Sequence, residues 1–155
     1  MYNRWYNQDE LYHYGVIGMK WGVRKARNAS QKGDQKRSAE ILKDVKVRSE
    51  QKLAKYETTY QKRQRKADRK FRKAERKANT LFSTNWGRKR SFKKAGKAQY
   101  KANRVAYKGK RWYERMNKTF KKANIKMSKQ SIKTGEEFIR IVRSQSQALY
   151  AMRYS

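Results

Sequence analysis

The stretch SAEILKDVKVRSEQKLAKYETTYQKRQRKADRKFRKAERKANTL, residues 38–81, decides the fold. Its apolar and small residues follow one another almost throughout at steps of three or four, which places them along one face of a helix. The members of this series are Leu42, Val45, Ser49, Leu53, Tyr56, Tyr60, Ala67, Phe71, Ala74, Ala78 and Leu81. Proline is absent from all 155 residues, so the commonest helix breaker does not interrupt the pattern. A helix over 38–82, starting at Ser38, would be about 67 Å long at 1.5 Å per residue.

A second helix is predicted beyond Ser83–Gly87, because STNWG has the composition of a turn. Gly96 and Gly109 are either weak points in this helix or places where another backbone comes close. Small and apolar residues again recur at helical spacing, namely Ala95, Ala98, Ala102, Val105, Gly109, Trp112, Met116, Phe120, Ala123 and Met127.

A third helix is predicted to start at Thr134–Glu137, and its apolar stripe runs from Phe138 to Met152. We expect this stripe to pack on the two long helices, with self-association as the alternative. The predicted fold class is therefore all-α: a long helical hairpin plus a short C-terminal helix, with an extended, irregular N-terminal arm.

The arm is predicted from the placement of glycine. Gly15, Gly18, Gly22 and Gly33 lie near the start of the chain, and the next glycine is Gly87. We therefore divide the chain into an aromatic, glycine-containing docking arm over 1–33 and a basic helical body over 34–155. The first residues do not resemble a secretory or organelle-targeting segment, so we expect a location inside a cell or a particle.

The charge balance of the chain indicates a polyanionic partner. Lys and Arg number 44 against 12 Asp and Glu, which gives a formal net charge of +32, and only 36% of the residues are hydrophobic. Such a composition leaves little room for a core that holds a catalytic pocket. Cysteine is absent and histidine occurs once, which excludes a disulfide scaffold, a Cys/His zinc site, an iron–sulfur cluster and a thiol nucleophile. We expect no enzymatic activity, no metal and no cofactor.

Basic residues between Lys62 and Arg111 are the predicted nucleic-acid contacts. No acidic residue lies between Glu75 and Glu114, so the cations there lack helical partners of opposite charge and need anions from outside. Nucleic-acid phosphates are the most direct source, ahead of an acidic protein or an anionic membrane surface. The predicted contacts are Lys62, Arg63, Arg65, Lys66, Arg69, Lys70, Arg72, Lys73, Arg76, Lys77, Arg88, Lys89, Arg90, Lys93, Lys94, Lys97, Lys101, Arg104, Lys108, Lys110 and Arg111.

Binding is expected at backbone phosphates, with double-stranded DNA favoured, because no zinc-finger spacing, RNA-recognition strand motif or leucine zipper is visible. No apolar run approaches the roughly 18 to 20 residues that span a bilayer, so we expect no membrane partner. Five aromatic residues could stack on unpaired bases, although their helical spacing favours a place in the helix seam or at an interface. These are Phe92, Tyr100, Tyr107, Trp112 and Tyr113.

Residues 11–25, LYHYGVIGMKWGVRK, crowd apolar side chains between three glycines. The segment is too short to fold alone, so we interpret it as a docking element with Met19 and Trp21 as anchors in a groove of another protein. Its glycine spacing fits neither the GxGxxG nor the Walker pattern of phosphate-binding loops. His13 has no second histidine, no cysteine and no evident carboxylate partner, which argues against a general base.

This stretch resembles a short motif that recurs near the ends of otherwise unrelated virion and head-morphogenesis proteins of tailed bacteriophages and prophages. The resemblance implies co-assembly with a phage head, with the motif acting as a capsid-directed or assembly-directed tag. The docking residues that it implies are His13, Gly15, Val16, Gly18, Met19, Lys20, Trp21, Gly22, Val23 and Arg24.

Charge and motif together predict a phage virion structural protein. We expect it inside the head or on its inner face, and in the host cytoplasm during assembly. Its arm would dock to a capsid or other virion protein while its helices bind packaged DNA, and a homo-oligomer is possible. The alternatives are a ribosomal-type RNA-binding protein and a transient scaffold-like head assembly factor.

Overall fold

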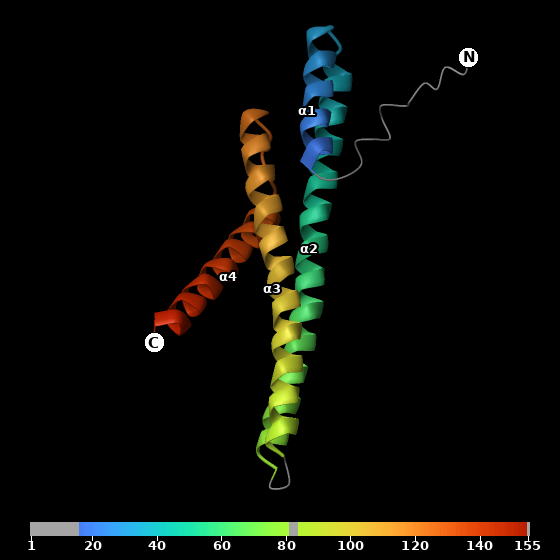
Figure 1. The fold of residues 1–155 in the computed structure, drawn as a ribbon. Coiled ribbons are helices and arrows are strands. Elements are labelled where there is room, and N and C mark those ends of the chain that lie inside the picture. The colour runs from blue at the N-terminus through green and yellow to red at the C-terminus, as the bar shows by residue number, and fades with distance from the viewer. Residues whose placement is uncertain (1–15, 81–83, 155) are drawn as a thin grey trace, which may run out of the picture.

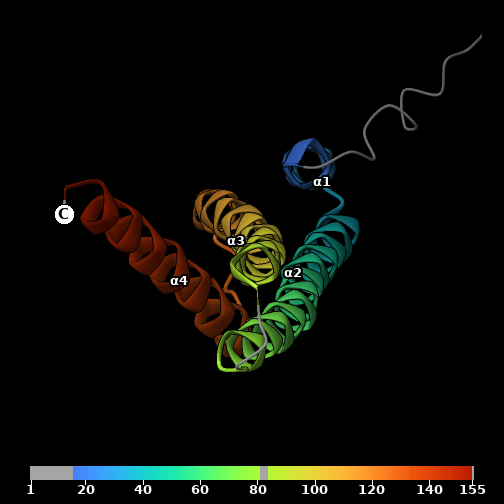
Figure 2. The same cartoon turned by 60° about the horizontal axis from the view of Figure 1, so that its bottom comes forward.

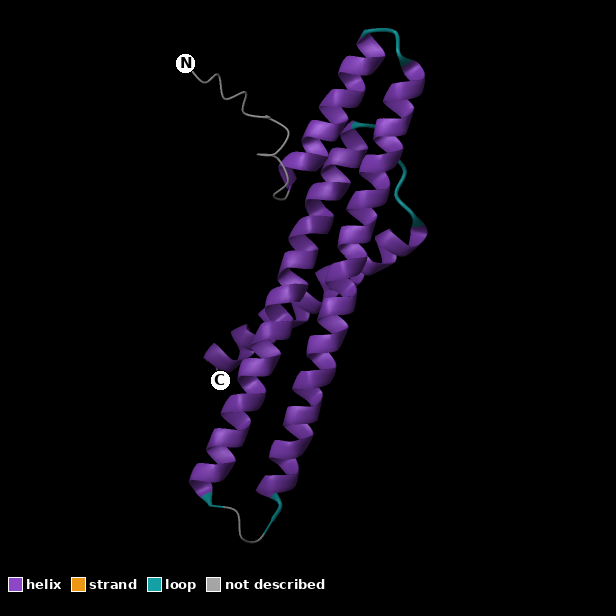
Figure 3. Ribbon diagram, turned by 90° about the vertical axis from the view of Figure 1, so that its right-hand side faces the viewer, coloured by secondary structure: helices purple, strands orange, loops and turns teal. Residues whose placement is uncertain are grey.

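The computed structural model describes the backbone of residues 16–80 and 84–154 and the side chains of residues 20–80 and 84–148. These residues form four helices and no strand: α1 (Val16–Gln31), α2 (Gln35–Ala78), α3 (Asn85–Lys122) and α4 (Lys129–Tyr154). Helices α2 and α3 run side by side as a long antiparallel hairpin, and α4 diverges from it (Figures 1 and 3). The predicted all-α fold with a hairpin and a C-terminal helix is confirmed.

A capping oxygen fixes the start of each hairpin helix. The Asp34 carboxylate accepts from the backbone N–H of Arg37 at 3.0 Å, so α2 begins before the predicted Ser38. The Thr84 hydroxyl accepts from the N–H of Gly87 at 3.2 Å. Helix α3 therefore begins inside the segment that the sequence predicts to be a turn.

Helix α4 begins at Lys129, earlier than the predicted start at Thr134. The Ser128 hydroxyl accepts from the N–H of Ser131 at 3.2 Å, and the N–H of Ser128 donates to Glu50 of α2 at 2.7 Å. The first contact is a local serine cap of the kind that sequence can indicate, and the second is a long-range contact that local composition does not reveal.

Residues Val16–Gln31 of the predicted irregular arm are helical, which corrects the prediction for that part of 1–33. Gly22 does not serve as a turn: a Cβ built on it would collide with Val45 of α2. This glycine therefore permits a close approach between two helices, and Ala26, one turn later, is buried. The turn comes at Gly33, whose φ of 82° favours glycine. His13 and Gly15 lie outside the described residues.

The core lies where α2, α3 and α4 meet. Its largest fully buried side chains are Leu53, Met116, Phe120 and Phe138, and the rings of Tyr60 and Phe138 pack edge to face with centroids 6.0 Å apart. The described part of the predicted C-terminal stripe therefore packs on the hairpin. The side chains of Leu149 and Met152 lie outside the described residues.

Two glycines permit α4 to approach α3 closely. A Cβ on Gly109 would lie 2.6 Å from the ring of Phe138, and a Cβ on Gly135 would collide with the ring of Tyr113. Gly109 thus allows the Phe138 ring of α4 to approach α3 closely. A Cβ on Gly96 would meet nothing within 4 Å, so this glycine corresponds to the weak point that the sequence allows.

Hydrogen-bonded amides also join the three helices. The Gln99 amide donates to Gln64 of α2 and to Asn103, both at 3.0 Å. Gln145 of α4 donates to the same Asn103 oxygen at 2.9 Å. Neighbouring side chains satisfy these partly buried groups, which fixes the relative position of the helices.

The Gly109→Ala variant tests the contact between α3 and α4. Alanine favours a helix, but its methyl group would displace the Phe138 ring, so we expect the free energy of unfolding to fall by about 1 to 3 kcal/mol. In the matched Gly96→Ala variant the methyl group meets open space, so this free energy should rise by about 0.5 to 1 kcal/mol. Urea unfolding followed by circular dichroism measures both. Stabilisation by both variants would contradict the packing of Phe138 on Gly109.

Candidate nucleic-acid interface

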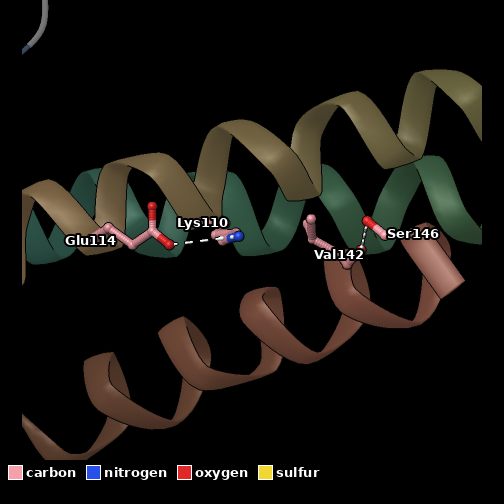
Figure 4. A network of polar contacts seen from close by, with 4 residues as sticks. All are labelled: Lys110, Glu114, Val142 and Ser146. Atoms are coloured by element: carbon pink, nitrogen blue, oxygen red, sulfur yellow. Dashed lines mark hydrogen bonds and ion pairs between the residues drawn. The ribbon is translucent and has the colours of Figure 1, made fainter.

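Carboxylates gather where α4 meets the hairpin. Glu50 accepts from Ser128 as described above, and Glu57 accepts from the Thr134 hydroxyl at 3.0 Å. Glu114 pairs with Lys110 at 3.7 Å on the part of α3 that lies beside α4 (Figure 4). Glu50 and Glu57 therefore support the attachment of α4, whereas the pair of Glu114 with Lys110 lies within α3.

Two tyrosines in this region have raised pKa values. Burial raises the pKa of Tyr60, and the negative charges of Glu137 and, to a lesser extent, Asp68 add to the effect. Burial also raises the pKa of Tyr113, with a further contribution from Glu136. Both phenols therefore stay neutral at physiological pH; Tyr113 belongs to the buried core, and Tyr60 packs against it.

Positively charged side chains gather in a groove between α2 and α3, which we call the hairpin groove. Its volume is about 310 Å³, and among the described residues no carboxylate lines it. The Arg63 guanidinium donates to the carbonyl oxygen of Lys101 at 3.1 Å, which ties the two walls together. The lining residues are Arg63, Lys66, Lys70, Lys94, Lys97, Ala98 and Lys101.

All six cations of the hairpin groove belong to the predicted nucleic-acid contacts. The structure spreads the other predicted cations over the surface of α2 and α3, where none is buried. Lys110 is engaged by Glu114, while Arg90 and Arg111 lie over the rings of Trp86 and Tyr107 at 5.0 and 5.9 Å. The sequence therefore identifies the cations correctly but does not show which of them converge.

A second cationic groove lies between α1 and α3, and we call it the α1–α3 groove. It has a volume of about 760 Å³, and no carboxylate of the described residues lines it. Arg27, Arg115, Lys118 and Lys122 are absent from the predicted contacts, although their three- and four-residue spacings place them on single helix faces. The lining residues are Lys20, Val23, Arg24, Arg27, Arg115, Lys118, Thr119 and Lys122.

Residues of the predicted docking motif are therefore divided between two surroundings. Gly22 packs against α2, and Trp21 is half-buried with the Lys25 ammonium 4.6 Å from its ring centroid. Lys20 and Arg24 line the α1–α3 groove together with Val23. The side chains of Val16 and Met19 and the surroundings of Gly18 lie outside the described set.

The five aromatic residues considered for base stacking also fall into two groups. Trp112 and Tyr113 are buried, and the Trp112 indole donates to the Ser49 carbonyl at 3.2 Å. The seam position expected for them is confirmed. Phe92, Tyr100 and Tyr107 are 41%, 69% and 50% exposed, so they lie outside the seam, and an interface position for these three stays a prediction.

Comparison with known proteins gives one match, over a short part of the chain. A family of unknown function, DUF7211, matches residues 7–28, the stretch that contains the motif. No curated protein and no solved structure matches the chain. Within the described residues, none of the helices is long and apolar enough to cross a membrane.

Cations in the hairpin groove repel one another, and salt screens this repulsion. The free protein should therefore be more stable at higher salt. Screening weakens exposed like-charge contacts as the Debye length falls from about 10 Å at 0.1 M to about 3 Å at 1 M. Replacing Lys66, Lys97 and Lys101 by Gln should raise the free energy of unfolding at low salt by roughly 0.5 to 1 kcal/mol and reduce the salt dependence.

The control removes three cations from a part of α2 that also holds acids: Lys36→Gln, Lys43→Gln and Arg48→Gln, the last of which pairs with Asp44 at 4.0 Å. This triple variant should not gain stability. Thermal unfolding at several salt concentrations measures both triples, and equal effects would contradict a local repulsion in the groove.

Proposed function

We propose that the chain is a non-enzymatic structural protein that binds packaged double-stranded DNA through its phosphates. The hairpin groove carries this proposal, because six cations from two helices face one channel that no described carboxylate lines. Each DNA strand presents a phosphate about every 3.4 Å, and each phosphate neutralised releases condensed counterions. Such binding is independent of base sequence.

The proposed setting is a phage particle. Support comes from the resemblance of residues 11–25 to the motif of tailed-phage virion proteins, and the same stretch lies within the DUF7211 match. In this proposal the motif docks to a capsid or other virion protein inside the head or on its inner face. The protein would reach that location from the host cytoplasm during assembly.

A second candidate function is binding to RNA with unpaired bases. The exposed rings of Tyr100 and Tyr107 favour it, because bases stack on accessible aromatic side chains. The two candidates differ in substrate: phosphate neutralisation alone does not prefer a single strand, whereas stacking requires one.

Loss of the groove cations should flatten the salt dependence of DNA binding. For the Lys66→Gln, Lys97→Gln, Lys101→Gln variant, the slope of log affinity against log salt should fall by up to about 0.9 for each lost phosphate contact. Fluorescence anisotropy with a labelled 24-base-pair duplex measures the slope, and the Lys36→Gln, Lys43→Gln, Arg48→Gln variant is the control. Tighter binding to a single-stranded RNA of equal length would favour the second candidate instead.

The location is tested in particles of the source virus. Quantitative mass spectrometry of nuclease-treated particles, before and after genome release, should find the chain in full particles. Departure with the DNA indicates an internal genome-bound protein, whereas retention with the shell indicates that docking dominates. Absence from particles would overturn the virion assignment and favour a transient assembly factor.

A further inference from the structure

Helix α3 carries cations at two positions of a seven-residue repeat without a single exception from residue 90 to residue 122. All ten side chains are exposed. A seven-residue period keeps residues on one face of a helix that packs along a partner. We call these ten residues the α3 ridge; the first column is Lys94, Lys101, Lys108, Arg115 and Lys122, and the second is Arg90, Lys97, Arg104, Arg111 and Lys118.

The two cationic grooves use the same positions of this repeat. In the hairpin groove α3 contributes Lys94, Lys97, Ala98 and Lys101. In the α1–α3 groove the residues three heptads later take their places, namely Arg115, Lys118, Thr119 and Lys122. The grooves therefore lie at equivalent positions on one face of α3. We call the hairpin groove and the α1–α3 groove the two stations of the ridge.

The opposite walls of the grooves are also alike. Arg63, Lys66 and Lys70 of α2 face the ridge in the hairpin groove, and Lys20, Arg24 and Arg27 of α1 face it in the α1–α3 groove. Each wall places three cations within about two helical turns. Helix α1 thus supplies three cations to the α1–α3 groove, as α2 supplies three cations to the hairpin groove.

The face between the stations is cationic and uncovered by α4. Arg104, Lys108 and Arg111 continue the ridge and are exposed. Helix α4 approaches α3 at Gly109 and Tyr113, which belong to other columns of the repeat. In the oblique view from the loop end of the hairpin, α1 and α4 lie on different sides of α3 (Figure 2).

The distance between the stations matches the repeat of B-form DNA. Three heptads of α-helix span about 31 Å at 1.5 Å per residue. One turn of duplex DNA spans about 34 to 36 Å. A duplex that lies along the ridge therefore presents equivalent phosphates near both grooves.

We propose that the α3 ridge is a two-station binding surface for duplex DNA, in which the hairpin groove and the α1–α3 groove hold phosphates about one helical turn apart. The inference rests on the proposed function, but it assigns Lys20 and Arg24 of the motif to phosphate contacts and leaves docking to the other motif residues. The ligand class is a B-form duplex long enough to reach both stations. A duplex shorter than this span binds one station at a time.

The test compares duplexes that do and do not span both stations. An 8-base-pair duplex is about 27 Å long and a 24-base-pair duplex about 82 Å at 3.4 Å per base pair. The variants of the full chain are the hairpin-groove triple (Lys66, Lys97 and Lys101 to Gln), the α1–α3-groove triple (Arg24, Arg115 and Lys118 to Gln) and the control triple (Lys36, Lys43 and Arg48 to Gln). Anisotropy titrations at fixed salt give the affinities, and circular dichroism compares the helix content of all variants.

Linked sites gain affinity because the second contact forms within one complex. Either groove triple should weaken binding of the long duplex at least about tenfold, and of the short duplex only about twofold, since the other station remains. A charge-conserving variant in which Arg24 and Arg115 are replaced by Lys, with Lys118 kept, should bind the long duplex with most of the wild-type affinity. A phosphate contact of this kind needs charge more than geometry.

Three results would overturn the inference. Equal losses on both duplex lengths would show that the stations are not bridged. An α1–α3-groove triple that behaves like the control, while the hairpin-groove triple binds weakly, would leave the proposed function standing without a second station. A wild-type chain that binds neither duplex would remove the proposed function itself.

Discussion

Close packing of small residues along α3 is the constraint on which the rest of the structure depends. Ala95, Ala102 and Ala106 are fully buried on α3, as are Ala67 and Ala74 on α2. Because these side chains are short, two helix backbones lie close together with little apolar area between them. Burial contributes roughly 25 cal/mol per Å², so the hairpin relies on length and fit, and larger residues such as Met116 and Phe120 supply a core only where α4 joins.

This narrow seam determines the distribution of charge. A thin apolar face leaves most of the circumference of each long helix to lysine and arginine, and the chain has too few acids to neutralise them. The acids that contact α4, such as Glu50 and Glu57, are used at that junction. The grooves are consequently left with cations from both walls, and an anion that fills them removes repulsion as well as adding contacts. In the proposed function, binding would therefore be coupled to folding, because a ligand bound to the folded state stabilises it.

The sequence predicts those features that depend on local periodicity. The steps of three and four around Leu53 and Val105 give the two long helices, and the absence of acids after Glu75 gives the basic faces. It does not predict features that depend on pairs of distant residues. The glycine cluster hides helix α1, since the role of Gly22 is apparent only when Val45 lies opposite. The α1–α3 groove is missed for the same reason, because Arg24 and Arg115 are adjacent only in the folded chain.

The motif shows why a short conspicuous stretch is difficult to interpret in isolation. As a sequence, its glycines and aromatic residues are typical of a segment that docks to another protein. In the structure Gly22 packs against Val45 of the same chain and Trp21 is half-buried. Lys20 and Arg24 line a cationic groove. Packing alone accounts for a glycine at position 22, because any Cβ there would meet Val45. Packing does not account for Lys20 and Arg24, which line the same groove as Arg115 and Lys118, because like charges at close range repel one another. In the proposed two-station surface, an external anion at this groove would offset that repulsion.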